Sequence, residues 1–212
     1  MIETSVREFW GSGPPPNLAA LLQLAGRQVP LAPYTTWGIG GPAAYLLAPA
    51  TANEARSVLA ATRTVGWPVF FLGRGSNVLI ADTGLPGITL HLHRFCTEVD
   101  WGEDEITVGA GVFLPRLAAS LAARGCSGYE FLIGIPGTVG AAVRLNAGTG
   151  PGQEMADRVS SVTVLTGDLE VRTLTAPDLA FGYRSSCLLA HPTWLVLQAT
   201  LRLARRWLMM AW

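Results

Sequence analysis

The fold is decided by the stretch Gly73-Arg74-Gly75-Ser76-Asn77-Val78-Leu79-Ile80-Ala81-Asp82, in which two glycines and two small polar residues open a loop. An apolar segment, Val69–Leu72, enters this loop and a second one, residues 78–81, leaves it, which predicts strand, glycine loop and strand. Successive N–H groups in such a loop form a concavity that suits phosphate oxygens. A dinucleotide-binding Rossmann unit would continue into a helix instead. The pattern favours a pyrophosphate held by turn amides, and an ordinary tight turn is the alternative.

A second glycine-rich segment runs from Gly128 to Gly148 and contains the stiff turn Ile135-Pro136-Gly137-Thr138. Each glycine in a regular element costs roughly 0.5–1 kcal/mol relative to alanine. A domain tolerates that cost where a flat ligand lies against the main chain. We therefore expect a ligand here as well.

The order and spacing of four blocks resemble the UDP-N-acetylenolpyruvoylglucosamine reductases, the MurB family of peptidoglycan synthesis. The blocks are residues 34–43, 73–82, 134–148 and 181–186, and together they cover most of residues 30 to 204. The resemblance implies an α+β, PCMH-type FAD-binding fold of two lobes with mixed sheets and flanking helices. It also implies NADPH-driven, FAD-dependent reduction of UDP-N-acetylglucosamine enolpyruvate to UDP-N-acetylmuramate.

The same resemblance assigns residues to FAD and to the substrate. The residues expected to hold FAD are Gly73, Arg74, Gly75, Ser76, Asn77, Gly134, Ile135, Gly137, Thr138, Gly140, Ala141 and Asn146. No histidine lies among them, so FAD is expected to bind non-covalently. Tyr183 and Arg184 are expected to bind the substrate. Arg184 is the expected catalytic residue, because a fixed guanidinium stabilises charge that develops on the substrate carboxylate. A structural ion pair is the alternative for Arg184, and Glu130 is expected to cap a turn rather than tune the flavin.

Departures from the family leave turnover open. The family's Gly-Ser/Cys-x-Phe-Lys-Asn-Pro-like block, which carries a proton donor, and its C-terminal Glu have no match here. The usual Asp-Ser-x-Phe after Tyr-Arg is Ser185-Ser186-Cys187-Leu188. We therefore expect the substrate domain to be absent, and a fragment, a frame-shifted product and a degenerate paralogue all fit that expectation. A non-catalytic FAD-binding remnant and another PCMH-type flavin oxidoreductase are the alternative functions.

Composition limits the remaining possibilities. The formal net charge is zero, so neither nucleic acid nor an anionic membrane is an expected partner. All fifteen basic residues are arginine, which excludes a Schiff-base lysine and a Walker lysine. Cys96, Cys126 and Cys187 are scattered and are expected to be reduced thiols. His91 and His93 share one strand face without further ligands nearby, so no metal site is expected. The sequence has no signal-peptide pattern and no apolar run of about 18 residues, which favours a cytoplasmic location. A monomer or weak oligomer is expected.

Glycine, proline and helix-capping residues predict where the parts of the chain begin and end. Residues 1–16 are expected to be a disordered lead-in, 17–95 a helix and a small lobe, 96–204 a larger lobe, and 205–212 an atypical tail. Thr51-Ala52-Asn53-Glu54 is a capping-box pattern that opens a helix, and Gly66 ends that helix. The other expected elements are helices over 18–27 (capped by Asn17) and 114–124 (closed by Gly125), strands over 106–108 and 194–203, and a hairpin of 162–165 and 169–174 around a type II′ turn at Gly167-Asp168.

Overall fold

The structure is a computed structural model that describes residues 18–205 of the chain. The polypeptide divides into two compact units. The first unit holds the described residues up to Phe95 together with Gly167–Glu170. The second holds Cys96–Thr166 and the described residues from Val171 onward. The lead-in expected over residues 1–16 and the tail from residue 206 lie outside the described residues.

The first unit is built on a four-stranded sheet in the order β1-β2-β4-β3. The strands are β1 (Gly26–Pro30), β2 (Pro42–Leu47), β3 (Val69–Leu72) and β4 (Leu85–His91). β1 pairs antiparallel with β2, whereas β4 pairs parallel with both β2 and β3. The sheet is therefore mixed, as the sequence predicted.

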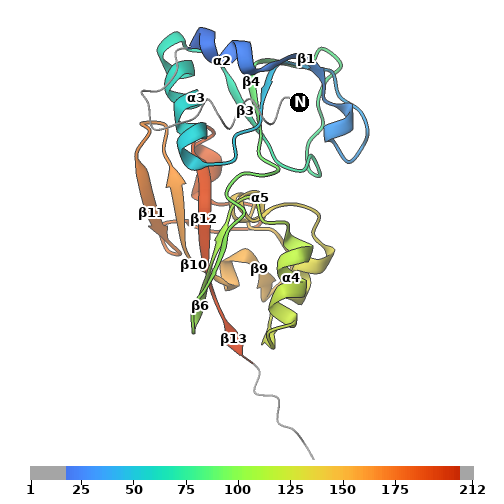
Figure 1. The fold of residues 1–212 in the computed structure, drawn as a ribbon. Coiled ribbons are helices and arrows are strands. Elements are labelled where there is room, and N and C mark those ends of the chain that lie inside the picture. The colour runs from blue at the N-terminus through green and yellow to red at the C-terminus, as the bar shows by residue number, and fades with distance from the viewer. Residues whose placement is uncertain (1–17, 206–212) are drawn as a thin grey trace, which may run out of the picture. The chain divides into compact units, whose positions relative to one another are not determined.

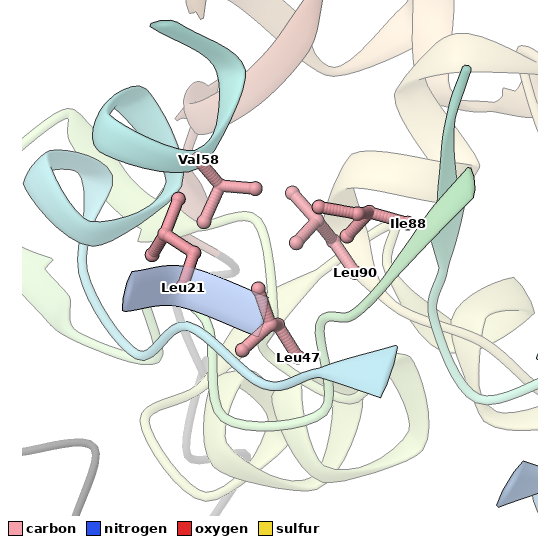
Figure 2. Close-up of a cluster of buried hydrophobic side chains, with 5 residues drawn as sticks. All are labelled: Leu21, Leu47, Val58, Ile88 and Leu90. Carbon is pink, nitrogen blue, oxygen red and sulfur yellow. The ribbon is translucent and has the colours of Figure 1, made fainter. Parts of the chain in front are cut away.

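Helices α2 (Leu18–Leu24) and α3 (Ala52–Val65) bury their apolar sides against this sheet. Leu21 of α2 and Val58 of α3 meet Leu47, Ile88 and Leu90 of the strands in one buried cluster (Figure 2). Four of these five side chains are fully buried, and removing a buried leucine from such a cluster typically costs about 2–5 kcal/mol. The cluster anchors both helices to the same sheet face (Figure 1).

Local signals set both ends of α3. The Thr51 hydroxyl accepts a hydrogen bond from the Glu54 N–H at 3.2 Å, and the Glu54 carboxylate accepts one from the Ala50 N–H at 2.6 Å. Gly66 adopts a left-handed φ of 65° at the other end and closes the helix. The predicted start and stop of this helix are confirmed, although Glu54 reaches Ala50 rather than the cap residue itself.

The second unit is built on a five-stranded sheet in the order β11-β10-β12-β6-β5, antiparallel throughout (Figure 1). Its strands are β5 (Val99–Trp101), β6 (Glu105–Gly109), β10 (Val159–Leu165), β11 (Val171–Thr175) and β12 (Leu195–Arg202). Strand pairs β8 (Gly148–Gly150) with β9 (Gln153–Glu154), and β7 (Cys126–Ser127) with β13 (Ala204–Arg205), stand apart from this sheet. The strands expected over 106–108 and 194–203 are therefore confirmed as β6 and β12.

Two helices belong to the second unit: α4 (Leu114–Ala122) and α5 (Val139–Arg144). Leu114, Leu117 and Leu121 of α4 are buried at spacings of three and four residues, which puts them on one helix face. Short 3-10 turns complete the unit: η2 (Glu130–Gly134), η3 (Met155–Asp157) and η4 (Cys187–Ala190), while η1 (Ala32–Tyr34) belongs to the first unit. Helices and strands together give the predicted α+β class.

Three local predictions are wrong. The helix expected over 18–27 ends at Leu24, because Gly26 and Arg27 pair with Leu46 and Tyr45 of β2. Residues 78–81 form no strand, because β4 occupies the place beside β3. The hairpin of β10 and β11 is present, but its left-handed residue is Leu169 (φ 67°) in a five-residue loop, so the turn is not type II′ at Gly167.

The described residues include no group of three or more His, Cys, Asp or Glu side chains placed to hold a metal ion. His91 and His93 instead stack their rings with centroids 4.2 Å apart, and the Tyr34 ring meets His91 edge-on at 4.9 Å. Among residues 18–205, no helix has the length and apolar character needed to cross a membrane.

Candidate functional site

The glycine loop of the first unit, residues 73–77, begins where β3 ends. Gly75 is buried and adopts a left-handed φ of 66°. A Cβ atom at this position would collide with the carbonyl oxygen of Tyr34 and would lie 2.7 Å from the Thr35 Cα. The Gly75 carbonyl also accepts a hydrogen bond from the Thr36 N–H at 3.0 Å. Close approach of another backbone segment therefore requires glycine at position 75.

That second backbone segment is the block of residues 34–43. The Gly41 N–H donates to the Ala81 carbonyl at 3.0 Å, which adds a second link between the two blocks. A Cβ atom on Gly41 would meet the Asp82 backbone, its carbonyl carbon at 2.5 Å. Two motif blocks that are well separated in sequence are thus one piece of structure. Trp37 and Leu79 stand out from this piece with 72% and 79% of their surface exposed.

The loop amides fit an anionic group. Within the described chain, the N–H groups of Gly75 and Asn77 donate to no acceptor, although Gly75 is buried. A buried N–H without a partner costs about 1–3 kcal/mol, so such a group is normally satisfied by water or a ligand. Ser76 is half-buried and Asn77 and Arg74 are exposed, so polar side chains surround these amides. The loop therefore has the donors that a pyrophosphate needs.

The glycine segment of the second unit packs backbone against backbone. The N–H groups of Val139 and Gly140 donate to the carbonyls of Val112 and Ala110 at 3.0 and 2.9 Å. A Cβ atom on Gly140 would lie 3.0 Å from the Ala110 Cβ. These two amides at the start of α5 are consequently used inside the protein. Close packing, rather than ligand contact, explains the small residue at position 140.

Other residues of this segment remain open to a ligand. Thr138 is the buried N-cap residue of α5, and its side chain makes no capping hydrogen bond. Gly134 and Ala141 are exposed, and a Cβ atom on Gly134 would meet nothing within 4 Å. Ile135 is half-buried, and buried Gly137 accepts a hydrogen bond from the Leu114 N–H at 3.0 Å. Gly134 and Ala141 are thus open to solvent, and Thr138 has a hydroxyl that no capping bond uses.

Asn146 is buried, with 2% of its surface exposed, and has a left-handed φ of 43°. Its side-chain Nδ2 donates to the Gly182 carbonyl at 3.0 Å. Its Oδ1 accepts from the Ala156 N–H at 2.9 Å. The sequence predicted that Asn146 lines the flavin groove, whereas its amide group is engaged by two backbone groups of the protein.

Tyr183 and Arg184 form the tip of a two-residue turn. The Gly182 N–H donates to the Ser185 carbonyl at 3.0 Å, and the Ser185 N–H returns a bond to the Gly182 carbonyl at 3.2 Å. Tyr183 is 93% exposed, and Arg184 is exposed with a left-handed φ of 51°. In the part of the chain that the structure describes, neither side chain makes a hydrogen bond or an ion pair. Described residues thus give no support to a structural ion pair for Arg184.

Arg144 is a residue whose role the sequence did not predict. Its guanidinium donates to the carbonyls of His191 at 2.8 Å and Trp194 at 3.2 Å. Its own carbonyl accepts from the Ser186 hydroxyl at 2.8 Å. Burial lowers the pKa of Arg144, with the neighbouring Cys187 opposing the shift. The one available signal was an arginine inside an otherwise apolar, glycine-rich segment.

Ser185, Ser186 and Cys187 follow the turn directly, so they bear on the question of a proton donor. Ser186 is buried and its hydroxyl is engaged by Arg144. Burial raises the pKa of the Cys187 thiol, and Asp178 raises it further. Cys187 therefore keeps its proton at neutral pH, as a proton donor must.

Comparisons with known proteins show the family and the fold. The family described as FAD binding domain matches residues 42–175. A UDP-N-acetylenolpyruvoylglucosamine reductase from a Synechococcus strain is 43% identical over 191 residues, covering 89% of this chain and 61% of that protein. The enzyme of the same name from Rubrobacter xylanophilus is 41% identical, with 88% and 62% covered. The crystal structure of UDP-N-acetylenolpyruvylglucosamine reductase (MurB) from Thermus caldophilus superposes with a TM-score of 0.73 and 38% identity, covering 86% of this chain and 63% of that one. The chain thus spans about three fifths of these relatives' length.

Proposed function

Because the chain belongs to the family of FAD binding domains and shares the MurB-type sequence and fold over most of its length, we propose that it holds FAD for reduction of an enolpyruvyl nucleotide sugar. The proposed reaction converts UDP-N-acetylglucosamine enolpyruvate to UDP-N-acetylmuramate with NADPH as reductant. The proposal rests on Arg184, whose exposed guanidinium is carried by a turn that buried residues hold in place. Arg184 itself has a left-handed φ in this turn.

The residues proposed to hold FAD are the loop amides of residues 73–77 together with Gly134, Ile135, Thr138 and Ala141 of the second glycine segment. Gly75 and Asn77 offer free N–H donors to the pyrophosphate, and Thr138 offers a hydroxyl. Bound FAD would supply hydride transfer between NADPH and the substrate. Asn146 is left out of the set that contacts FAD through its side chain, because its amide is already engaged.

Arg184 acts on the substrate. Addition of hydride to the enolpyruvyl double bond moves electron density toward the neighbouring carboxylate. A guanidinium makes two parallel hydrogen bonds to a carboxylate and stabilises that charge most strongly where water is excluded. Tyr183, beside it on the same turn, contributes a ring and a hydroxyl to the same ligand. Removing one such charge-stabilising group typically lowers kcat by about 10²–10³-fold.

The test measures NADPH oxidation by FAD-loaded protein with and without UDP-N-acetylglucosamine enolpyruvate. Arg184→Gln is expected to abolish most of the substrate-dependent rate. Arg116→Gln is the matched control, because Arg116 is another exposed arginine of the second unit and lies outside the proposed site. Equal substrate-dependent rates in the two variants would refute the role of Arg184.

A second candidate function is FAD binding without turnover. It is considered because the chain spans only 61% and 62% of the length of the two reductases that it matches. General acid catalysis contributes about 10²–10⁴-fold, so this candidate predicts flavin reduction by NADPH without substrate-dependent oxidation. An ordinary substrate-dependent rate would exclude it, and Cys187→Ala would then test the donor. A cytoplasmic location and a monomeric or weakly oligomeric state belong to the same proposal, and gel filtration tests the latter.

A further inference from the structure

We propose that Asn146 and Ser186 are positioning residues that fix the turn carrying Arg184 for its anionic ligand. This inference rests on the proposed function, because it concerns how Arg184 meets the substrate carboxylate. One of their hydrogen bonds holds the chain before the tip of the turn, and the other holds the chain after it. Asn146 bonds the carbonyl of Gly182 before the tip, and Ser186, just after the tip, bonds the carbonyl of Arg144.

The turn has little to hold it by itself. Its two backbone hydrogen bonds join Gly182 and Ser185 only, and the exposed tip residues add no side-chain bond within residues 18–205. Arg184 also occupies the left-handed region, which a non-glycine residue enters at a cost of roughly 1–2 kcal/mol. A conformation of this kind persists only where the surroundings impose it.

The surroundings that impose it are buried. Asn146 is 2% exposed and Ser186 is 4% exposed, and both hydrogen bonds are 3.0 Å or shorter. The Asn146 side chain is itself held by the Ala156 N–H. Its backbone has a left-handed φ, which asparagine tolerates better than most residues. Arg144 is fixed in turn by the carbonyls of His191 and Trp194.

The use of buried hydrogen bonds to order an exposed turn points to ligand binding rather than to stability alone. Buried polar groups order a turn whose own side chains face outward and make no hydrogen bond in the described chain. Holding a guanidinium in place before a ligand arrives lowers the entropy cost of binding.

The test compares substrate affinity in four variants by titrating FAD-loaded protein with UDP-N-acetylglucosamine enolpyruvate. Arg184→Gln is expected to weaken binding by about 10- to 100-fold, as loss of a charged hydrogen-bond donor does. Asn146→Asp keeps the acceptor for Ala156 but loses the donor to Gly182, and Ser186→Ala loses its single bond. Both are expected to weaken binding. Ser160→Ala is the control, because it removes a side-chain bond to the Thr200 carbonyl at 3.2 Å within the sheet.

A double-mutant cycle separates positioning from direct contact. If Asn146 acts through Arg184, the double variant of Asn146→Asp and Arg184→Gln binds no more weakly than Arg184→Gln alone. Additive losses would overturn the inference, as would wild-type affinity in Asn146→Asp. Wild-type affinity in Arg184→Gln, or no substrate binding by the wild type, would instead refute the proposed function, so the two failures are distinguishable.

Trypsin supplies a readout that needs no ligand. The chain has no lysine, so trypsin cuts only after arginine, and mass spectrometry identifies cleavage after Arg184. A tight turn must open locally before a protease can cut it. Asn146→Asp and Ser186→Ala are expected to speed this cleavage several-fold, with Ser160→Ala unchanged. Unchanged cleavage in both variants would overturn the inference, and Ser186→Ala carries the test if Asn146→Asp does not fold.

Discussion

The carbonyl oxygen of Tyr34 occupies the place that a Cβ atom of residue 75 would fill. The glycine loop and the block of residues 34–43 are therefore locked together by the absence of a side chain. From the sequence, Gly75 would be interpreted as leaving room for a pyrophosphate, but the first group that needs the room belongs to the protein. We expect FAD binding to depend on this contact indirectly, because the contact sets the direction of the loop amides.

Gly75→Ala is expected to lower the free energy of unfolding by about 2–4 kcal/mol, from a left-handed φ and a backbone collision together, and to abolish FAD binding. Gly38→Ala is the matched control, because Gly38 has a φ of 67° but nothing within 4 Å of its would-be Cβ. It isolates the φ cost, about 1 kcal/mol, and should keep FAD. Urea unfolding and flavin absorbance measure both effects. Equal destabilisation in the two variants would show that the Tyr34 contact is unimportant.

The protein reconstituted with FAD is expected to be yellow and to release all of its flavin on acid precipitation. Within residues 18–205 the loop amides of Gly75 and Asn77 donate to no acceptor, and no histidine lies in either glycine segment to form a covalent bond. Visible absorbance of the pellet and the supernatant measures this directly. Flavin that stays with the precipitated protein would contradict non-covalent binding.

Thr51→Ala is expected to destabilise the first unit by about 1 kcal/mol, because its hydroxyl caps the Glu54 N–H at the start of α3. Ser57→Ala provides the comparison. Its hydroxyl bonds the Asn53 carbonyl at 3.0 Å within the same helix and at an exposed position, so its loss should be nearly neutral. Denaturant midpoints of the two variants should differ accordingly, and similar midpoints would show that the cap contributes little.

Stability is expected to fall at high pH because of Tyr129. Burial raises the pKa of Tyr129 to about 12, against the opposing effect of the Arg158 guanidinium near its ring. The unfolded value is about 10, so between about pH 10 and pH 12 the folded state holds a proton that the unfolded state has lost. The contribution, about 2–3 kcal/mol, is complete below pH 10 and disappears as the pH rises through the folded pKa.

Tyr129→Phe should flatten this part of the pH dependence, while lowering stability at neutral pH through loss of the hydrogen bond to the Arg202 carbonyl. Tyr183→Phe is the control, because that ring is 93% exposed. Urea midpoints measured from about pH 9 to pH 11.5 give the slopes. A slope in Tyr129→Phe equal to that of the wild type would refute the assignment.

The parts of the fold that could be predicted from the sequence are those set by short-range signals. Thr51, Glu54 and Gly66 determine α3 within one helix length, and short apolar segments indicate β6 and β12. The errors arise where a distant segment decides. Gly26 leaves the helix because β2 offers it a partner, and residues 78–81 lose their strand to β4, which no local pattern reveals.

The candidate site divides in the same way. The glycine loop and the pair Tyr183 and Arg184 could be proposed from the sequence because their residues carry the chemistry themselves, and their roles remain predictions. The structural partners of Asn146 and Gly140 could not be predicted, since Gly182, Ala156 and Ala110 lie far from them in sequence or carry no recognisable motif. In the sequence alone, an asparagine whose side-chain amide bonds the protein cannot be distinguished from one that binds a ligand.

The strand orders of the two sheets bear on synthesis of the chain. In each sheet the strand that comes last in sequence enters between two earlier ones: β4 between β2 and β3, and β12 between β10 and β6. A nascent chain that leaves the ribosome therefore exposes two unpaired strand edges in each unit until the last strand has emerged. Such edges invite pairing with other chains, so each unit passes through a period of exposure to aggregation that ends only when its central strand arrives.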